Sequence, residues 1–280
     1  MRLFSTKNNQ IIIAKIKKNG PEYLFSNYFN IFCNNNFLYF YQRNLLYHPN
    51  FNSKTSNELN HKIEKISIQS DNTLVAWYHK KNENFKTLVF FHGNAGNLSN
   101  RIYKLNELSK MNLNYLIFAY RGFNGNKGKP TEEGLYKDAD NVIKWLKSKN
   151  ILENQIVLYG ESLGTAISVN VAQYKEFAGI ILEAPFTSML EMGQKYYPIF
   201  PVKYLLKDKF ETIKKIKNLR SPILIMHGKK DKIVPFEMGQ KIYNLSNNPK
   251  FNYFNDYDDH MMEYNLDLVN SINSFINNLN

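Results

Sequence analysis

Ile156-Val157-Leu158-Tyr159-Gly160-Glu161-Ser162-Leu163-Gly164 is the stretch that decides the fold of this 280-residue chain. Its first four residues form an apolar run with the length of a buried strand, and a helical pattern follows from Ser162 to Gln173. The pattern G-x-S-x-G recurs by chance, but here it lies directly between a strand and a helix. That context predicts a nucleophile elbow, a sharp turn that raises the Ser162 hydroxyl above the edge of a sheet.

On both sides of this turn, short apolar runs alternate with longer helical patterns, as in a parallel sheet built from strand–helix–strand units. The predicted strands are 66–68, 74–78, 88–91, 115–119, 156–159, 179–182, 222–226 and 251–254, and the first two form an antiparallel pair. The predicted helices are about 99–110, 131–149, 162–173, 235–245 and 262–279, with Thr131 as an N-cap. The sequence therefore predicts an α/β fold with a mostly parallel, eight-stranded sheet flanked by helices.

One interval is too long for this pattern. About 40 residues separate Leu182 from Pro222, where a crossover of a dozen or more would suffice. An excess of this size inside a compact domain usually has a function. It contains the aromatic run 196–202 and then the lysine-rich run 203–217. We expect residues 184–220, inserted between strands 6 and 7, to form a lid with an apolar face; packing of 196–202 on the core is the alternative.

A serine hydroxyl is a poor nucleophile without a base, and the base needs a third group to fix its tautomer. Behind an elbow, the partners follow in the order Ser, Asp or Glu, His. Two histidines follow Ser162. His227 directly follows a predicted strand, where a structural role is expected, whereas His260 lies in the loop before the last helix. We predict His260 as the general base.

The acid is predicted to be Asp231. This residue follows the carboxyl end of a predicted parallel strand, the edge where catalytic groups gather in open α/β sheets. Its chief rival is Glu183, at the end of the preceding strand. Asp256, Asp258 and Asp259 are too close to His260 in sequence to orient it well.

An oxyanion hole takes one backbone N–H from the residue after the nucleophile and one from the loop after the third strand. The first predicted donor is therefore Leu163. The second lies in the loop 92–97, where Asn94 is the first choice and Ala95 the second. His92 is interpreted as a structural residue.

The bulk composition excludes several classes of function. The formal net charge is +12, but the lysines are spread along the chain and no nucleic-acid-binding motif accompanies them. The glycine-rich loop 122–129 fails as a phosphate-binding loop because its glycine spacing is wrong and Pro130 stands where Ser or Thr would be needed. No metal-binding motif is present, and Cys33 is the single cysteine. We therefore predict no cofactor, no metal and no nucleic-acid partner.

The N-terminal residues 1–47 are predicted to form a basic and amphipathic segment ahead of a hydrolytic domain that spans 48–280. Residues 1–21 carry no carboxylate, and residues 23–47 are rich in aromatic and aliphatic side chains interrupted by asparagines. No run is long enough to span a bilayer. Residues 23–47 are interpreted as an amphipathic helical segment that packs on the body or lies at a lipid interface. The basic residues 1–21 either form a solvated charged face or lie against an anionic membrane surface. The expected location is cytoplasmic or peripheral to a membrane, with organellar targeting as an alternative.

In five places the chain resembles the Bem46-like branch of the α/β-hydrolases, which includes α/β-hydrolase domain-containing proteins of types 13 and 17. The matching segments are 92–97, 120–123 with 130–136, 160–165, 182–189, and His227-Gly228 with Asp231. The similarity covers roughly residues 45–265. It implies the α/β-hydrolase fold, the same three triad residues, and scaffold roles for Arg121 and Glu183. It also implies membrane association through the N-terminus, and type 17 members are protein depalmitoylases.

The chain departs from that branch around the histidine. The branch usually has glycines before this residue and Asn-Asp after it, whereas here the run is Asp258-Asp259-His260-Met261-Met262. The function expected from the sequence is hydrolysis of a carboxylic ester or acyl-thioester, carried by a small molecule or an acylated protein, through an acyl-enzyme on Ser162. A peptidase of the same fold and a non-catalytic scaffold are the alternatives.

Overall fold

The computed structural model describes residues 37–50, 58–69 and 71–279, so the predictions for residues 1–36 lie outside the described residues. Its centre is an eight-stranded sheet in the order β10-β9-β8-β7-β4-β6-β3-β2. Its strands are β2 (Glu64–Ile68), β3 (Leu74–His79), β4 (Thr87–Phe91), β6 (Asn114–Phe118), β7 (Ile156–Glu161), β8 (Gly179–Glu183), β9 (Ile223–Gly228) and β10 (Lys250–Asn255). β3 runs antiparallel to both β2 and β6, and the other neighbours are parallel. The predicted sheet is confirmed.

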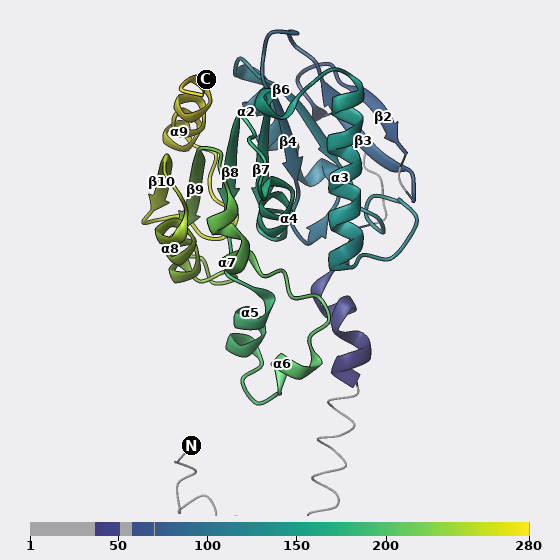
Figure 1. Ribbon diagram of the computed structural model, residues 1–280, viewed down its shortest axis with the longest axis vertical. Coiled ribbons are helices and arrows are strands. Elements are labelled where there is room, and N and C mark those ends of the chain that lie inside the picture. The colour runs from purple at the N-terminus through teal and green to yellow at the C-terminus, as the bar shows by residue number, and fades with distance from the viewer. Residues whose placement is uncertain (1–36, 51–57, 70, 280) are drawn as a thin grey trace, which may run out of the picture.

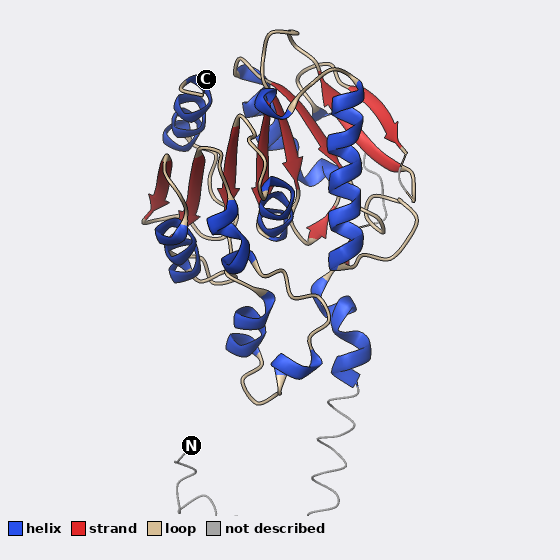
Figure 2. Cartoon of the chain, in the orientation of Figure 1, coloured by secondary structure: helices blue, strands red, loops and turns tan. Residues whose placement is uncertain are grey.

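Helices flank this sheet, as predicted. The principal ones are α2 (Ile102–Lys110), α3 (Glu132–Ser148), α4 (Leu163–Ala172), α8 (Phe236–Leu245) and α9 (Leu266–Asn277). Figure 1 shows α3 and α4 in front of the strands, and Figure 2 shows the strands enclosed between helices. The central strands β4 and β7 are buried along their whole length, which explains why they read as continuous apolar runs.

The strand register brings three loops to one point. Phe91 of β4 and Leu182 of β8 both pair with Gly160 of β7. Because these strands are parallel, the loops that follow all three begin at the same edge of the sheet, beside Ser162.

Side-chain caps set the helix ends. The Thr131 hydroxyl accepts a hydrogen bond from the Gly134 N–H (3.0 Å), so the predicted N-cap of α3 is confirmed. The last helix was predicted from about Met262, but α9 begins at Leu266 because the Asn265 side chain caps it by accepting from the Leu268 N–H. The residues between His260 and this cap form no helix.

The long interval between β8 and β9 holds the short helices α5 (Met189–Tyr196), α6 (Val202–Leu205) and α7 (Thr212–Lys215) and the 3₁₀ turn Ile216–Asn218. In Figure 1, α5 and α6 extend beyond one end of the sheet, next to the helical residues 37–46. The second half of the interval packs on the body instead, since the side chains of Phe210 and Ile216 are fully buried.

Hydrogen bonds join the helical residues 37–46 to the interval between β8 and β9. The Arg43 guanidinium donates two hydrogen bonds to the Asp208 carboxylate (2.8 and 3.0 Å). The Gln42 side chain donates to the Leu205 carbonyl (2.9 Å) and accepts from the Lys207 N–H (2.7 Å). Just beyond, the two-residue strands β1 (His48–Pro49) and β5 (Ala95–Gly96) pair in parallel. The sequence predicted none of these contacts.

Candidate active site

Ser162 occupies the turn between β7 and α4 with a backbone φ of +51°, which an L-residue rarely adopts. Its N–H donates to the Glu183 carbonyl (2.9 Å), and its own carbonyl accepts from the Thr165 N–H (2.9 Å), so the strained conformation is held from both sides. A side chain at Gly164 would collide with the Phe91 carbonyl. The second glycine of the motif is therefore needed for α4 to pack this closely on β4.

The three residues predicted to act together lie in one hydrogen-bonded row. The Ser162 Oγ lies 3.1 Å from His260 Nε2, and His260 Nδ1 lies 2.7 Å from Asp231 Oδ2. With the proton on Nδ1, that nitrogen donates to the carboxylate, and Nε2 is left to accept from the serine hydroxyl. The rival acid Glu183 makes its polar contacts elsewhere.

The Asp231 carboxylate is fixed from several directions. Its Oδ1 accepts hydrogen bonds from the N–H groups of Ile233 and Val234 (both 2.8 Å), and His227 Nε2 lies 3.3 Å from Oδ2. Burial acts to raise the pKa of Asp231, but the contacts with His227 and His260 outweigh it and hold this pKa well below its usual range. The carboxylate is therefore ionised at neutral pH, as a group that orients an imidazole must be.

The two predicted oxyanion donors lie beside the serine. Asn94 and Leu163 line the same cavity as Ser162, and Leu163, as the first residue of α4, has an N–H with no acceptor inside its own helix. Asn94 is held by the end of the helical residues 37–46 and by the residues that follow, because its side chain donates to the Leu46 carbonyl (2.8 Å) and its carbonyl accepts from the His48 N–H (2.9 Å). The second choice, Ala95, pairs with His48 in the β1–β5 ladder.

His92 is fully buried beneath this loop. Its Nδ1 donates to the Gly93 carbonyl (2.7 Å). Burial and then the nearby Arg101 guanidinium lower the pKa of His92 to about 3, so the ring is neutral at pH 7. It is placed to shape the loop rather than to exchange protons with solvent.

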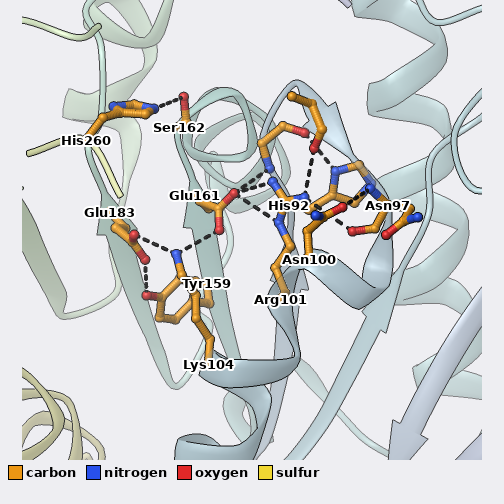
Figure 3. A network of polar contacts seen from close by, with 12 residues as sticks. His92, Asn97, Asn100, Arg101, Lys104, Tyr159, Glu161, Ser162, Glu183 and His260 are labelled. Atoms are coloured by element: carbon orange, nitrogen blue, oxygen red, sulfur yellow. Dashed lines mark hydrogen bonds and ion pairs between the residues drawn. The ribbon is translucent and has the colours of Figure 1, made fainter. Parts of the chain in front are cut away.

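Glu161, the residue before the serine, links the turn at Ser162 to the loop after β4 (Figure 3). Its Oε1 accepts from the Gly93 N–H (3.2 Å) and from Arg101 Nη2 (2.5 Å), and its Oε2 accepts from Lys104 Nζ (2.8 Å). Burial acts to raise the pKa of Glu161, but Arg101 and Lys104 hold it well below its usual range. One ionised carboxylate thus connects the end of β7, the loop after β4 and helix α2.

Lys104 extends this network under the elbow (Figure 3). The same ammonium donates to Glu183 Oε1 (2.6 Å), and Glu183 Oε2 accepts from the Tyr159 hydroxyl (2.5 Å). The side chains of Lys104 and Glu183 are each only 1% exposed. Two cations, Arg101 and Lys104, therefore face two carboxylates, Glu161 and Glu183, in a buried, charge-balanced group.

Replacing the buried lysine by an apolar side chain of similar length tests this balance. In Lys104→Met, Glu161 and Glu183 face each other with one cation missing, and we expect unfolding to require about 3–5 kcal/mol less free energy. Urea denaturation followed by circular dichroism measures the change. The control is Lys110→Met, whose 66% exposed side chain pairs with Glu107 at the surface and should cost below about 1 kcal/mol. Equal losses in the two variants would contradict the role given to Lys104.

An apolar cavity of about 290 Å³ opens at the Ser162 hydroxyl. The interval between β8 and β9 contributes Met192, Tyr197 and Phe200, and the helical residues 37–46 contribute Leu38 and Leu46. Part of the aromatic run 196–202 therefore lines this cavity, whereas Ile199 of the same run is exposed.

Sequence reasoning missed Glu161, Arg101, Lys104 and the wall formed by residues 37–46. A signal for the network was present, because Lys104 lies one helical turn before Leu108 and beside Leu105, on the apolar face of α2. A cation on a core-facing position requires a buried carboxylate nearby. No such signal exists for Arg43 and Asp208, which are 165 residues apart.

Within residues 37–50, 58–69 and 71–279, no group of three or more His, Cys, Asp or Glu side chains is placed to hold a metal ion. In the same ranges, every helix is too short or too polar to cross a bilayer.

Comparison with known proteins finds two matching family models and several relatives similar in sequence to parts of this chain. Residues 121–256 match the prolyl oligopeptidase family, and residues 29–179 match a family described as Chlamydia CHLPS protein. An uncharacterized protein of Mycobacterium tuberculosis is 34% identical over 188 residues, which cover 66% of this chain and 67% of the relative.

Two animal relatives are similar over a smaller part of their length. The lysophosphatidylserine lipase ABHD12 of Xenopus tropicalis is 30% identical, with 61% of this chain and 49% of the relative covered. The human α/β-hydrolase domain-containing protein 17B is 33% identical, with 58% and 56% covered. The chain thus spans about half the length of these two relatives. Among solved structures, an esterase of Pyrococcus furiosus superposes with a TM-score of 0.68 at 17% identity, covering 84% of this chain and 99% of the esterase.

Proposed function

Because the chain belongs to the α/β-hydrolase superfamily, we propose that it is a serine hydrolase that cleaves carboxylic esters or acyl-thioesters. The observation that carries the proposal is the row Ser162–His260–Asp231, with contacts of 3.1 and 2.7 Å, at the mouth of an apolar cavity. The elbow, the buried acid and the backbone donors each have the chemistry that such a reaction needs.

The proposed reaction has two halves. Ser162 Oγ attacks the acyl carbon while His260 Nε2 takes the hydroxyl proton, and Asp231 stabilises the imidazolium that forms. The N–H groups of Leu163 and Asn94 donate to the oxygen that becomes negative. The tetrahedral intermediate then expels the alcohol or thiol, which receives the proton from His260. Water, deprotonated by His260, releases the acid from Ser162 by the same path in reverse.

The cavity indicates the kind of acyl group. Its walls beside Ser162 are built largely from apolar side chains such as Leu38, Met192 and Phe200, so they favour an alkyl chain over a polar one. The relative named as a lysophosphatidylserine lipase is consistent with a lipid-derived acyl group.

We expect kcat/KM for p-nitrophenyl esters and matched acyl-thioesters to rise about fourfold for each added methylene until the cavity is full, the factor that corresponds to about 0.8 kcal/mol. In Met192→Trp the larger ring fills part of the cavity, so activity on octanoyl esters should fall about tenfold while activity on acetyl esters stays within twofold. The control is Leu152→Trp, at an exposed position outside the cavity. A flat chain-length profile in the unaltered protein would contradict acyl-chain binding in this cavity.

A peptidase is the second candidate, favoured by the match of residues 121–256 to the prolyl oligopeptidase family. The same three residues could cleave an amide, with His260 donating its proton to the leaving amine. Peptide p-nitroanilides in the same panel separate the two candidates. Turnover of the anilides at rates above those of the esters would favour the peptidase.

A further inference from the structure

The helical residues 37–46 present apolar side chains on two opposite faces. Leu38, Leu45 and Leu46 line the cavity beside Ser162. Phe37 and Phe40 do not line it, and their side chains are 54% and 69% exposed. Lining the cavity therefore accounts for the apolar side chains on one face of this helix, but it does not account for the exposed apolar side chains on the other face.

The segment around α6 shows the same excess of exposed apolar surface. Ile199 is 91% exposed and Tyr204 is 81% exposed, and neither lines the cavity. Their neighbours Phe200 and Val202 do line it. The chain here alternates between side chains directed into the cavity and side chains directed away from the protein.

These two segments form one surface. The Gln42 side chain joins them through its bonds to Leu205 and Lys207, and Lys207 Nζ lies 3.9 Å from the centre of the Tyr39 ring. We call residues 37–46 and 196–207 together the rim, because they wall the cavity and extend beyond the body of the protein (Figure 1). Contiguous exposed apolar surface of this kind marks a binding face.

The charge of the rim indicates its partner. Its charged residues are Arg43, Lys203 and Lys207, and neither range contains an aspartate or glutamate. Arg43 is paired with Asp208, which leaves two lysines on the face that carries Ile199 and Tyr204. Lysine is depleted at protein–protein interfaces, whereas lysine beside tyrosine and aliphatic side chains suits the headgroup region of a bilayer.

Only part of the predicted cationic run 203–217 belongs to this face. Lys214 pairs with Glu211, and Lys215 donates to the Asn170 side chain and the Tyr136 hydroxyl. Those lysines are held on the body. Within the rim, the cationic side chains besides Arg43 are therefore Lys203 and Lys207.

We propose that the rim docks on the surface of a lipid bilayer that contains anionic lipids. Ile199, Tyr204 and Phe40 enter the headgroup region, and Lys203 and Lys207 lie against the lipid phosphates. Docking in this position turns the cavity wall toward the membrane. The surface exists whatever bond Ser162 attacks, so this proposal stands independently of the proposed function.

Vesicle flotation with the full-length chain tests the proposal. We use Ser162→Ala protein, so that no turnover alters the lipids, and vesicles of phosphatidylcholine alone or mixed with phosphatidylglycerol. We expect binding to the mixed vesicles at low salt, weakened as salt rises. The double variant Ile199→Asp, Tyr204→Asp should bind at least tenfold more weakly, and Lys203→Glu should weaken binding by about fivefold or more.

Two controls separate docking from general effects of charge or folding. Leu152→Asp places the same carboxylate at a half-exposed apolar position outside the rim, and Lys144→Glu reverses an exposed charge on α3. Both should bind vesicles as the parent does. Each rim variant should also show the circular dichroism spectrum and thermal midpoint of the parent, which verifies the fold.

Three outcomes would overturn the proposal: no binding of the parent to mixed vesicles, equal binding by parent and double variant, or equal binding to both kinds of vesicle. A fourth would be a dimer in solution that the double variant abolishes, since the rim would then be covered by a second copy of the chain.

Discussion

Ser162→Ala is expected to lower kcat on an activated ester by a factor on the order of 10⁶. The variant loses the attacking oxygen, while the backbone donors and the cavity remain to bind the ester. Folding should be nearly unchanged, because the hydroxyl makes one side-chain contact, with His260. Initial rates with p-nitrophenyl butyrate measure the loss, and a thermal melt verifies the fold.

The matched control is Ser168→Ala on the same helix, whose buried hydroxyl donates to the Thr165 carbonyl (3.0 Å) and lies away from the cavity. It should retain the parent activity. A fluorophosphonate probe should label the unaltered chain and Ser168→Ala but not Ser162→Ala. Full activity of Ser162→Ala would refute the nucleophile, and a parent chain that neither turns over nor takes the probe would favour the non-catalytic scaffold.

Asp231→Asn is expected to reduce kcat by a factor on the order of 10⁴ with little change in KM. The N–H groups of Ile233 and Val234 both point at Oδ1, so they orient the new amide with its oxygen toward them and its NH₂ toward His260. Nδ1 then becomes an acceptor, the ring proton moves to Nε2, and Nε2 can no longer take a proton from Ser162. Initial rates with p-nitrophenyl butyrate at several concentrations measure kcat and KM separately.

Glu183→Gln separates the two candidate acids. Glu183 contacts Lys104 and Tyr159 rather than His260, so its replacement should destabilise the fold while kcat stays within about tenfold. Asp256→Asn, at an exposed residue paired with Lys229, serves as a neutral control. If Glu183→Gln lost more of kcat than Asp231→Asn, the acid would belong on the preceding strand.

Local patterns in the sequence were sufficient for the sheet. Strands such as β4 and β7 are continuous apolar runs because helices cover both faces of a parallel sheet. The alternation of such runs with helical patterns indicated a mostly parallel sheet, since parallel neighbours need crossover connections, whereas the strand order came from the structure. The elbow followed from five adjacent residues, and Asp231 and His260 followed from chain order and from their positions after predicted strands. The placement of Ser162, His260 and Asp231 within hydrogen-bond distance was thus anticipated, although their catalytic roles remain predictions.

Contacts between distant segments were decided only by the tertiary structure. From the sequence, Glu183 was a rival of Asp231 for the role of the acid and Glu161 had no predicted role, whereas the structure places Lys104 of α2 between the two carboxylates. Residues 37–46 belong to a segment for which the sequence left two alternatives open, packing on the body or lying at a lipid interface. Only the structure shows that Arg43 meets Asp208 across 165 positions and that the same helix walls the cavity. The physical reason is that a strand or helix can be predicted from the pattern of residues next to one another in sequence. A buried ion pair, or a cavity wall built by two distant segments, depends instead on which surfaces the completed fold brings together. The sequence therefore located the candidate site at Ser162, and the packing of residues 37–46 against the interval after β8 decided the shape of the cavity beside it.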